Sequence, residues 1–135
     1  MDIANIASGD RTFEIVNPGN GENLGVRITV CSVDDSRMVK IKRKISDDRL
    51  VLERRNKSFT ASDIDENNIK MLLVAVLGWE WYSPTGNEAD QAKYNGEVPD
   101  FTPANLRAIL SDKRIPWFRA QINEEISDTE SFFSV

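Results

Sequence analysis

Alternation of apolar and polar residues marks the first ordered part of the chain. Thr12 to Val16 alternates as a strand does, and Val26 to Ser32 sets Val26, Ile28 and Val30 against polar neighbours. The turn-forming sequence Asn-Pro-Gly-Asn-Gly at 17–21 separates the two segments. The pattern therefore predicts a β-hairpin. Residues 1–11 are small and polar, and we expect them to form a flexible N-terminus.

Helical spacing follows the hairpin. Met38, Ile41, Ile45 and Leu52 fall on one face of a helix that is expected to run to about Arg55. Ser32 and Asp35 match a capping box at its start, with Asp in place of the usual Glu. A second helix is predicted to begin after a cap at Thr60 or Ser62. It includes the continuous apolar run 71–77 and is expected to stop at Gly78.

Breaks in the pattern indicate a long loop over 79–100, with a short hairpin as an alternative. Thr102 and Pro103 then start a short helix to Leu110, and apolar residues from Ile115 to Ile126 mark a last helix that ends near Asp128. The predicted fold class is α+β and mainly helical: an N-terminal β-hairpin followed by a helical body of about four helices. We expect one domain over residues 12–133.

Charge is distributed unevenly. The chain has 135 residues and a net charge of −5, yet residues 40–57 carry +5 and residues 58–135 carry −7. The basic helix suggests a charged contact surface formed by Lys40, Arg43, Lys44, Arg54 and Arg55. Two interpretations stay open: the helix binds nucleic acid, or it complements the acidic remainder within the chain or between subunits. The second is favoured because the pI is about 4.8, the cations surround the helix, and no aromatic residue lies between Met38 and Ser58 to stack on bases.

Residues for catalysis are scarce. The chain has no histidine, and the sequence contains no phosphate-binding loop, nucleophile elbow, CxxC pair or calcium loop. Cys31 falls opposite the valines of its strand, so we expect a small, half-buried residue and not a nucleophile. These features predict a non-enzymatic protein without a cofactor or metal.

Membrane insertion is not expected either. The longest apolar run has seven residues, whereas a spanning helix needs about 20. The chain does not open with a signal-peptide pattern, and its lone cysteine fits a reducing compartment. We therefore expect a cytoplasmic protein.

Most of the aromatic residues follow residue 78. Trp79 and Phe101 are expected to attach the long loop to the body. The others can form a protein-binding surface, because aromatic residues are enriched where proteins bind one another. The candidate partner-binding residues are Trp81, Trp117, Phe118, Phe132 and Phe133. The last two either fold back on the body or remain available to a partner.

The ordered set of segments resembles the tail assembly chaperones of long-tailed, siphovirus-type bacteriophages. The likeness covers residues 12 to 133. It rests on the sequences FEIVNP, LGVRITV, VPDFTPAN and IPWF at 13–18, 24–30, 98–105 and 115–118, together with the basic helix, the apolar helix before Gly78-Trp79 and the closing segment 128–133. The loop 83–94 is longer than the family pattern leads us to expect.

This resemblance implies a non-enzymatic protein of the infected host's cytoplasm that is absent from the mature virion. Its expected partners are the phage tape measure protein, which it keeps soluble, and the tail tube protein, recruited through a longer frameshifted form. It also implies a homo-oligomer. Two alternatives stay open: a structural minor tail or connector protein of the virion, and a nucleic-acid-binding regulator acting through the basic helix 40–57.

Overall fold

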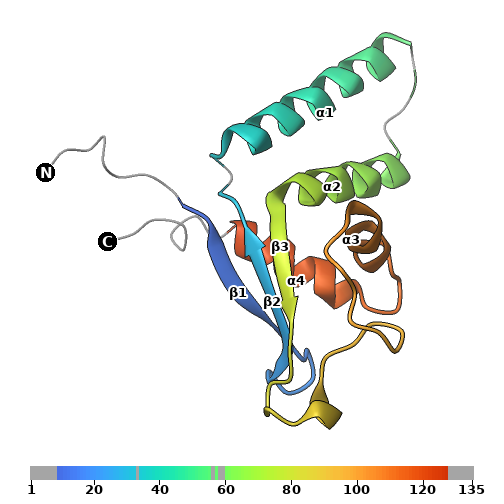
Figure 1. Ribbon diagram of the computed structural model, residues 1–135. Coiled ribbons are helices and arrows are strands. Elements are labelled where there is room, and N and C mark those ends of the chain that lie inside the picture. Colours follow the sequence, from blue (N-terminus) through green and yellow to red (C-terminus); the bar gives the residue numbers. More distant parts are fainter. Residues whose placement is uncertain (1–8, 33, 56, 58–59, 128–135) are drawn as a thin grey trace, which may run out of the picture.

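The computed structural model describes residues 9–32, 34–55, 57 and 60–127. These residues form a three-stranded antiparallel sheet and four α-helices, which confirms the predicted α+β class (Figure 1). The elements are, in chain order, β1 (Arg11–Val16), β2 (Asn23–Val30), α1 (Ser36–Arg54), α2 (Ala61–Ala75), β3 (Val76–Trp81), the 3-10 helix η2 (Glu88–Asp90), α3 (Pro103–Leu110) and α4 (Pro116–Ser127).

The sheet has the order β1-β2-β3, with β2 in the centre. Strands β1 and β2 form the predicted hairpin, in which Phe13 is opposite Ile28. The helical pair α1 and α2 then connects β2 to β3. Strand β3 pairs antiparallel with β2, so that Ile28 is also opposite Trp79. The apolar residues of all three strands therefore share one face.

Strand β3 corrects the sequence-based prediction. The helix expected to reach Gly78 ends at Ala75, and Val76 already has an extended backbone. Residues 79–81, expected to begin a loop, complete the strand. A run in which every residue is apolar fits a buried helix and a buried strand equally well. Its periodicity therefore does not show where the helix ends and the strand begins. The alternation of Trp79, Glu80 and Trp81 was the available signal.

Helices α1 and α2 form an antiparallel pair next to the sheet (Figure 1). The predicted span of α1 is confirmed, but its cap is not at Ser32. Asp35 is the N-cap, and its side chain accepts a hydrogen bond from the backbone N–H of Arg37. Helix α2 begins with a capping box in which Thr60 and Asp63 bond each other's backbone N–H groups. Thr60 is thus the cap, as one of the two predicted alternatives.

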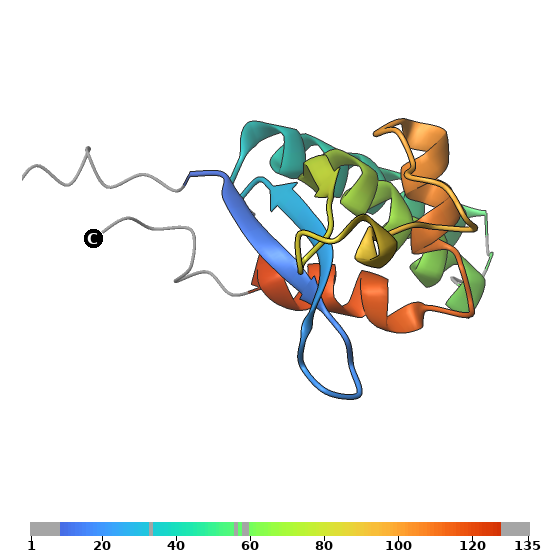
Figure 2. The same ribbon diagram turned by 60° about the horizontal axis from the view of Figure 1, so that its bottom comes forward.

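Helices α3 and α4 follow their predicted spans, and α4 lies along the apolar face of the sheet (Figure 2). Thr102 caps α3, and Pro103 occupies its first turn. The loop between β3 and α3 contains a tight turn at Asn95 and Gly96, which both have positive φ, closed by a bridge between Tyr94 and Glu97. This turn is the short hairpin that the sequence offered as an alternative within the long loop.

The core lies between the sheet and the helices. Its largest fully buried side chains include Ile15, Ile28, Met38, Leu72, Leu106, Ile109 and Ile122. Two polar contacts fix α4 in place. Gln121 bonds both the N–H and the C=O of Val16, at 2.9 and 2.8 Å, and so satisfies part of the edge strand. Asn68 of α2 and Asn123 of α4 exchange two amide hydrogen bonds.

Cys31 is fully buried, contrary to the expected half-buried position. It follows the last residue of β2, so the alternation of the strand no longer governs its side chain. Its backbone N–H donates to the C=O of Ala75 at 2.9 Å. Burial raises the pKa of the Cys31 thiol, which agrees with a packing role.

Gly25 provides a stability test of the β2–β3 pairing. It has a φ of +92°, and an added Cβ would lie 2.2 Å from the backbone oxygen of Tyr82. Gly86 has a φ of +80° and open space around it. We expect Gly86→Ala to cost about 1 kcal/mol of unfolding free energy from backbone strain, and Gly25→Ala about 3 kcal/mol or more because a backbone clash adds to the strain. Urea denaturation measures both values, and equal losses would contradict the close approach.

Candidate binding site: an aromatic pocket between the sheet and helix α4

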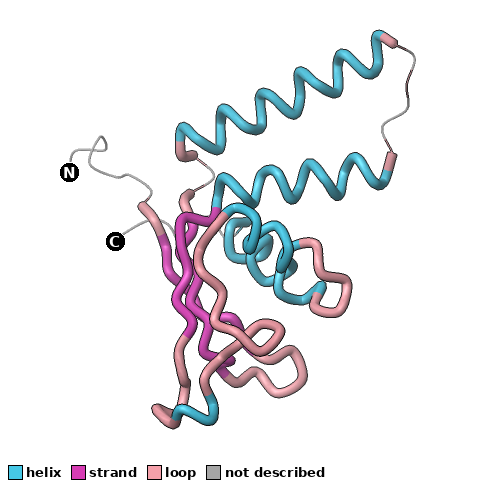
Figure 3. The backbone as a smooth tube through the Cα atoms, turned by 45° about the vertical axis from the view of Figure 1, so that its right-hand side comes forward, coloured by secondary structure: helices cyan, strands magenta, loops and turns pink. Residues whose placement is uncertain are grey.

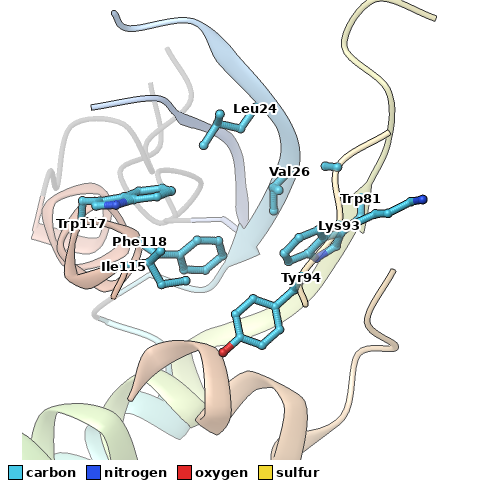
Figure 4. Close-up of a pocket in the computed structure, with 9 residues that line it drawn as sticks. Leu24, Val26, Trp81, Lys93, Tyr94, Ile115, Trp117 and Phe118 are labelled. Atoms are coloured by element: carbon cyan, nitrogen blue, oxygen red, sulfur yellow. The ribbon is translucent and has the colours of Figure 1, made fainter. Parts of the chain in front are cut away.

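An apolar pocket of about 310 Å³ opens between the end of the β2–β3 ladder and the start of α4 (Figure 4). Strand β2 contributes two aliphatic side chains, β3 contributes one tryptophan, and the long loop and the start of α4 provide the other walls. The lining residues are Leu24, Val26, Trp81, Ala92, Lys93, Tyr94, Ile115, Trp117 and Phe118.

Strand pairing positions the first aromatic residue. Trp81 is the last residue of β3 and is opposite Val26, which places its indole on the covered face of the sheet. The indole stacks on Phe118 of α4, with ring centroids 6.4 Å apart and an interplanar angle of 21°. Trp117 precedes Phe118 on α4, and the two ring centroids are 6.3 Å apart. The three rings therefore join the sheet to the helix at the pocket.

A polar cluster holds Tyr94 in the opposite wall. Its hydroxyl donates to a carboxylate oxygen of Asp112 at 2.5 Å, and Arg114 bonds the same carboxylate at 2.7 Å. The bonds from Arg114 and Tyr94 hold the pKa of Asp112 well below its ordinary value of 3.8. The hydrogen bond that Tyr94 donates to Asp112, together with burial, raises the pKa of Tyr94. The cluster ties the loop before α3 to the connection between α3 and α4.

Two polar groups distinguish the pocket from ordinary core. The Nε1–H of Trp81 is buried, and no acceptor lies within hydrogen-bond distance of it among the described residues. Lys93 is exposed and has no ion pair in the described part of the chain. An enclosed N–H without an acceptor is costly. The pocket can thus hold a large apolar side chain from a partner, and the residues around it offer a hydrogen-bond donor and a cation.

Of the five predicted partner-binding residues, three line this pocket together: Trp81, Trp117 and Phe118. Phe118 is 3% exposed, so it supports the pocket from the core and does not present an open edge. Phe132 and Phe133 lie outside the described residues. Tyr94 and Ile115 belong to the pocket but were not predicted, because their neighbours in space are distant in sequence.

Trp79 and Phe101 attach the loop to the body, as predicted. The indole N–H of Trp79 donates to the C=O of Pro99 at 3.0 Å, and the two rings meet edge to face with centroids 5.3 Å apart. Phe101 remains 41% exposed. It therefore provides a matched aromatic residue away from the pocket lining.

The predicted charged surface lies on α1 and not at the pocket. Lys40, Arg43, Lys44, Arg54 and Arg55 are all exposed. None of them pairs with a carboxylate in the described part of the chain. The charge-complement prediction, within the chain or between subunits, therefore stays a prediction for these residues.

No family model, curated protein or solved structure matches this chain. Within the described residues no helix is long and apolar enough to cross a membrane. The same residues contain no group of three or more His, Cys, Asp or Glu side chains that could hold a metal ion. The pocket geometry is consequently the main structural guide to function.

The cluster of Tyr94, Asp112 and Arg114 should make the stability of the fold depend on pH. Because the pKa of Asp112 is lower in the folded chain than its ordinary 3.8, the ionised carboxylate stabilises the fold above that value. This stabilisation decreases as the pH falls below 3.8. Asp112→Asn should lower the urea midpoint at pH 7, and the gap from the unmodified chain should narrow in acid. Glu124→Gln, which changes an exposed residue of α4, is the control. A gap that does not change with pH would contradict this role.

Proposed function

We propose that the chain is a non-enzymatic tail assembly chaperone of a long-tailed bacteriophage, which binds the tape measure protein and keeps it soluble. The aromatic pocket is the observation that supports this function most directly. Three residues that the sequence predicts to bind a partner come together there, beside a buried indole N–H that has no acceptor among the residues the structure describes. The resemblance over residues 12–133 indicates which protein is the partner, and the pocket is the candidate site for binding it.

The physical requirement fits a pocket of this size. A tape measure protein exposes apolar helical stripes until the tail tube encloses it. A chaperone must cover these stripes with contacts weak enough for the growing tube to displace. One apolar side chain per pocket, repeated over many copies of the chaperone, gives such a contact, because avidity and not single-site affinity holds the complex. The proposal therefore includes a homo-oligomer in the host cytoplasm, absent from the mature virion.

The family resemblance adds the tail tube protein as a second partner, through a longer frameshifted form of the chain. The proposal for the present chain does not depend on that form. It requires a soluble complex with the tape measure protein and a contribution from the pocket. Co-expression with the tape measure protein encoded in the same genome tests both requirements.

Trp117→Ala is the most informative pocket variant, because Trp117 is partly exposed whereas Phe118 is buried. We expect the tape measure protein to precipitate alone and to co-purify with the unmodified chain. Trp117→Ala should reduce the soluble tape measure protein by about fivefold or more, since a central tryptophan contributes much of such an interface. Phe101→Ala is the control and should have little effect. Circular dichroism should show unchanged helical content in both variants.

A separate double variant, Phe132→Ala with Phe133→Ala, tests the predicted role of the C-terminal aromatic pair. Loss of solubilisation at equal helical content would support that role. The proposal fails if the unmodified chain does not retain the tape measure protein. It also fails if the chain is present in purified virions, because it would then be a structural minor tail or connector protein.

A further inference from the structure

Two grooves flank the contact between α1 and α2, away from the aromatic pocket. Each has a volume of about 350 Å³. One is lined by Lys42, Ile45, Ser46 and Arg49 of α1 with Ile64 and Asn67 of α2. The other is lined by Arg37, Lys40, Ile41 and Lys44 of α1 with Val74 of α2. Both combine aliphatic residues with basic residues contributed by α1.

Helix α1 is firmly packed at one end. Met38, near its start, is fully buried, whereas Leu50 and Val51, near its end, are 50% and 44% exposed. Ile64, which faces this end from α2, is 59% exposed. Figure 3 shows the two helices diverging in the same direction. Both helices thus carry exposed aliphatic side chains at this end, and Ile64 lines the groove beside Ile45.

The acidic residues of α2 do not neutralise α1. Asp65 pairs with Arg119, Glu66 pairs with Arg107, and Asp63 is engaged in the cap at Thr60. On α1, Arg49 pairs with Glu53, and Arg37 pairs with Asp35. The lysines that line the grooves, Lys40, Lys42 and Lys44, have no ion pair in the described part of the chain.

We propose that the α1–α2 face binds an acidic amphipathic helix of another protein, seated along the groove that Lys42 and Ile45 of α1 form with Ile64 of α2. The aliphatic residues match the apolar stripe of such a helix, and the lysines match its carboxylates. A helix laid beside α1 and α2 would complete a three-helix layer, a common mode of helix recognition. This surface is additional to the aromatic pocket and does not depend on the proposed function.

Two other occupants fit less well. Nucleic acid would match the lysines but would leave Ile64 exposed, and α1 has no aromatic residue for base stacking. A second copy could offer the acidic loop between β3 and α3. The helix described in that loop has three residues, too short to fill a groove between two long helices.

Fluorescence anisotropy with designed peptides tests the proposal. The probe is a peptide of about 18 residues, five helical turns, with leucines at helical spacing and glutamates elsewhere. One control peptide replaces glutamate by lysine, and a second keeps the composition but scrambles the leucines. A duplex oligonucleotide is the fourth probe. We expect the acidic peptide to bind about tenfold more tightly than either control peptide, and binding to weaken as salt rises.

Paired variants locate the site. Ile64→Ser should weaken binding of the acidic peptide about fivefold, and Lys42→Gln about threefold, whereas the double change Lys40→Gln with Lys44→Gln, in the other groove, should have little effect. Their matched controls, Val98→Ser and Lys113→Gln, change an exposed aliphatic residue and an exposed lysine elsewhere, and should leave binding unchanged. All six substituted residues are exposed, so the variants should keep the fold.

Four outcomes would overturn the proposal. Equal binding of the scrambled peptide would show that the surface binds acidic peptides through charge alone. Tighter binding of the oligonucleotide would show that the surface binds nucleic acid. Sedimentation showing self-association that Ile64→Ser abolishes would assign the face to a second copy. Absence of binding by the acidic peptide would leave the face without the proposed occupant. None of these outcomes bears on the tape measure protein.

Discussion

The antiparallel pairing of β2 with β3 determines where everything else in this molecule lies. Val30, at the end of β2, pairs with Val76, at the start of β3, so the chain between them must leave and return at the same point. The N–H of Cys31 bonds the C=O of Ala75 and closes this point. Helix α1 runs outward and α2 runs back. Because α2 packs on the body, α1 is left with α2 as its main neighbour, and its two sides stay open.

The opposite end of the same ladder creates the aromatic pocket. There Val26 pairs with Trp81, and the indole of Trp81 stacks on Phe118 of α4. The loop that follows must cross this end to reach α3, and the bond between Tyr94 and Asp112 fixes it as a wall. The two candidate binding surfaces thus lie at opposite ends of one pair of strands. This separation allows the chain to hold two different segments at once.

The sequence predicted much of the fold, where local signals are strong. The hairpin, the cap at Thr60, the Thr102-Pro103 start of α3 and the last helix all agree with the structure. Strand β3 was missed because an unbroken apolar run does not distinguish helix from strand. A second error follows from the first, because the sequence predicts a loop at Trp81, which lies in strand β3.

The candidate site was predictable in part. Trp81, Trp117 and Phe118 were selected as aromatic residues after the second helix, without knowledge that they meet. Tyr94 could not be assigned, because its role depends on a bond to Asp112, eighteen positions away, and nothing local marks that pair. The sequence also could not predict that the lysines of α1 lack carboxylate partners on α2 in the described part of the chain. Charge totals showed that acids were available in 58–135, but not that those of α2 were engaged with Arg107, Arg119 and Thr60.

Hydrogen–deuterium exchange on the complex with the tape measure protein tests the central claim most directly. The account predicts slower exchange of the amides in residues 91–97 and 115–118 when the partner is bound, because these segments form the pocket walls. The start of β1, where Arg11 pairs with Val30 at the opposite end of the sheet, should exchange at the same rate in both states. Unchanged exchange at the pocket walls in a complex that nevertheless forms would contradict the account.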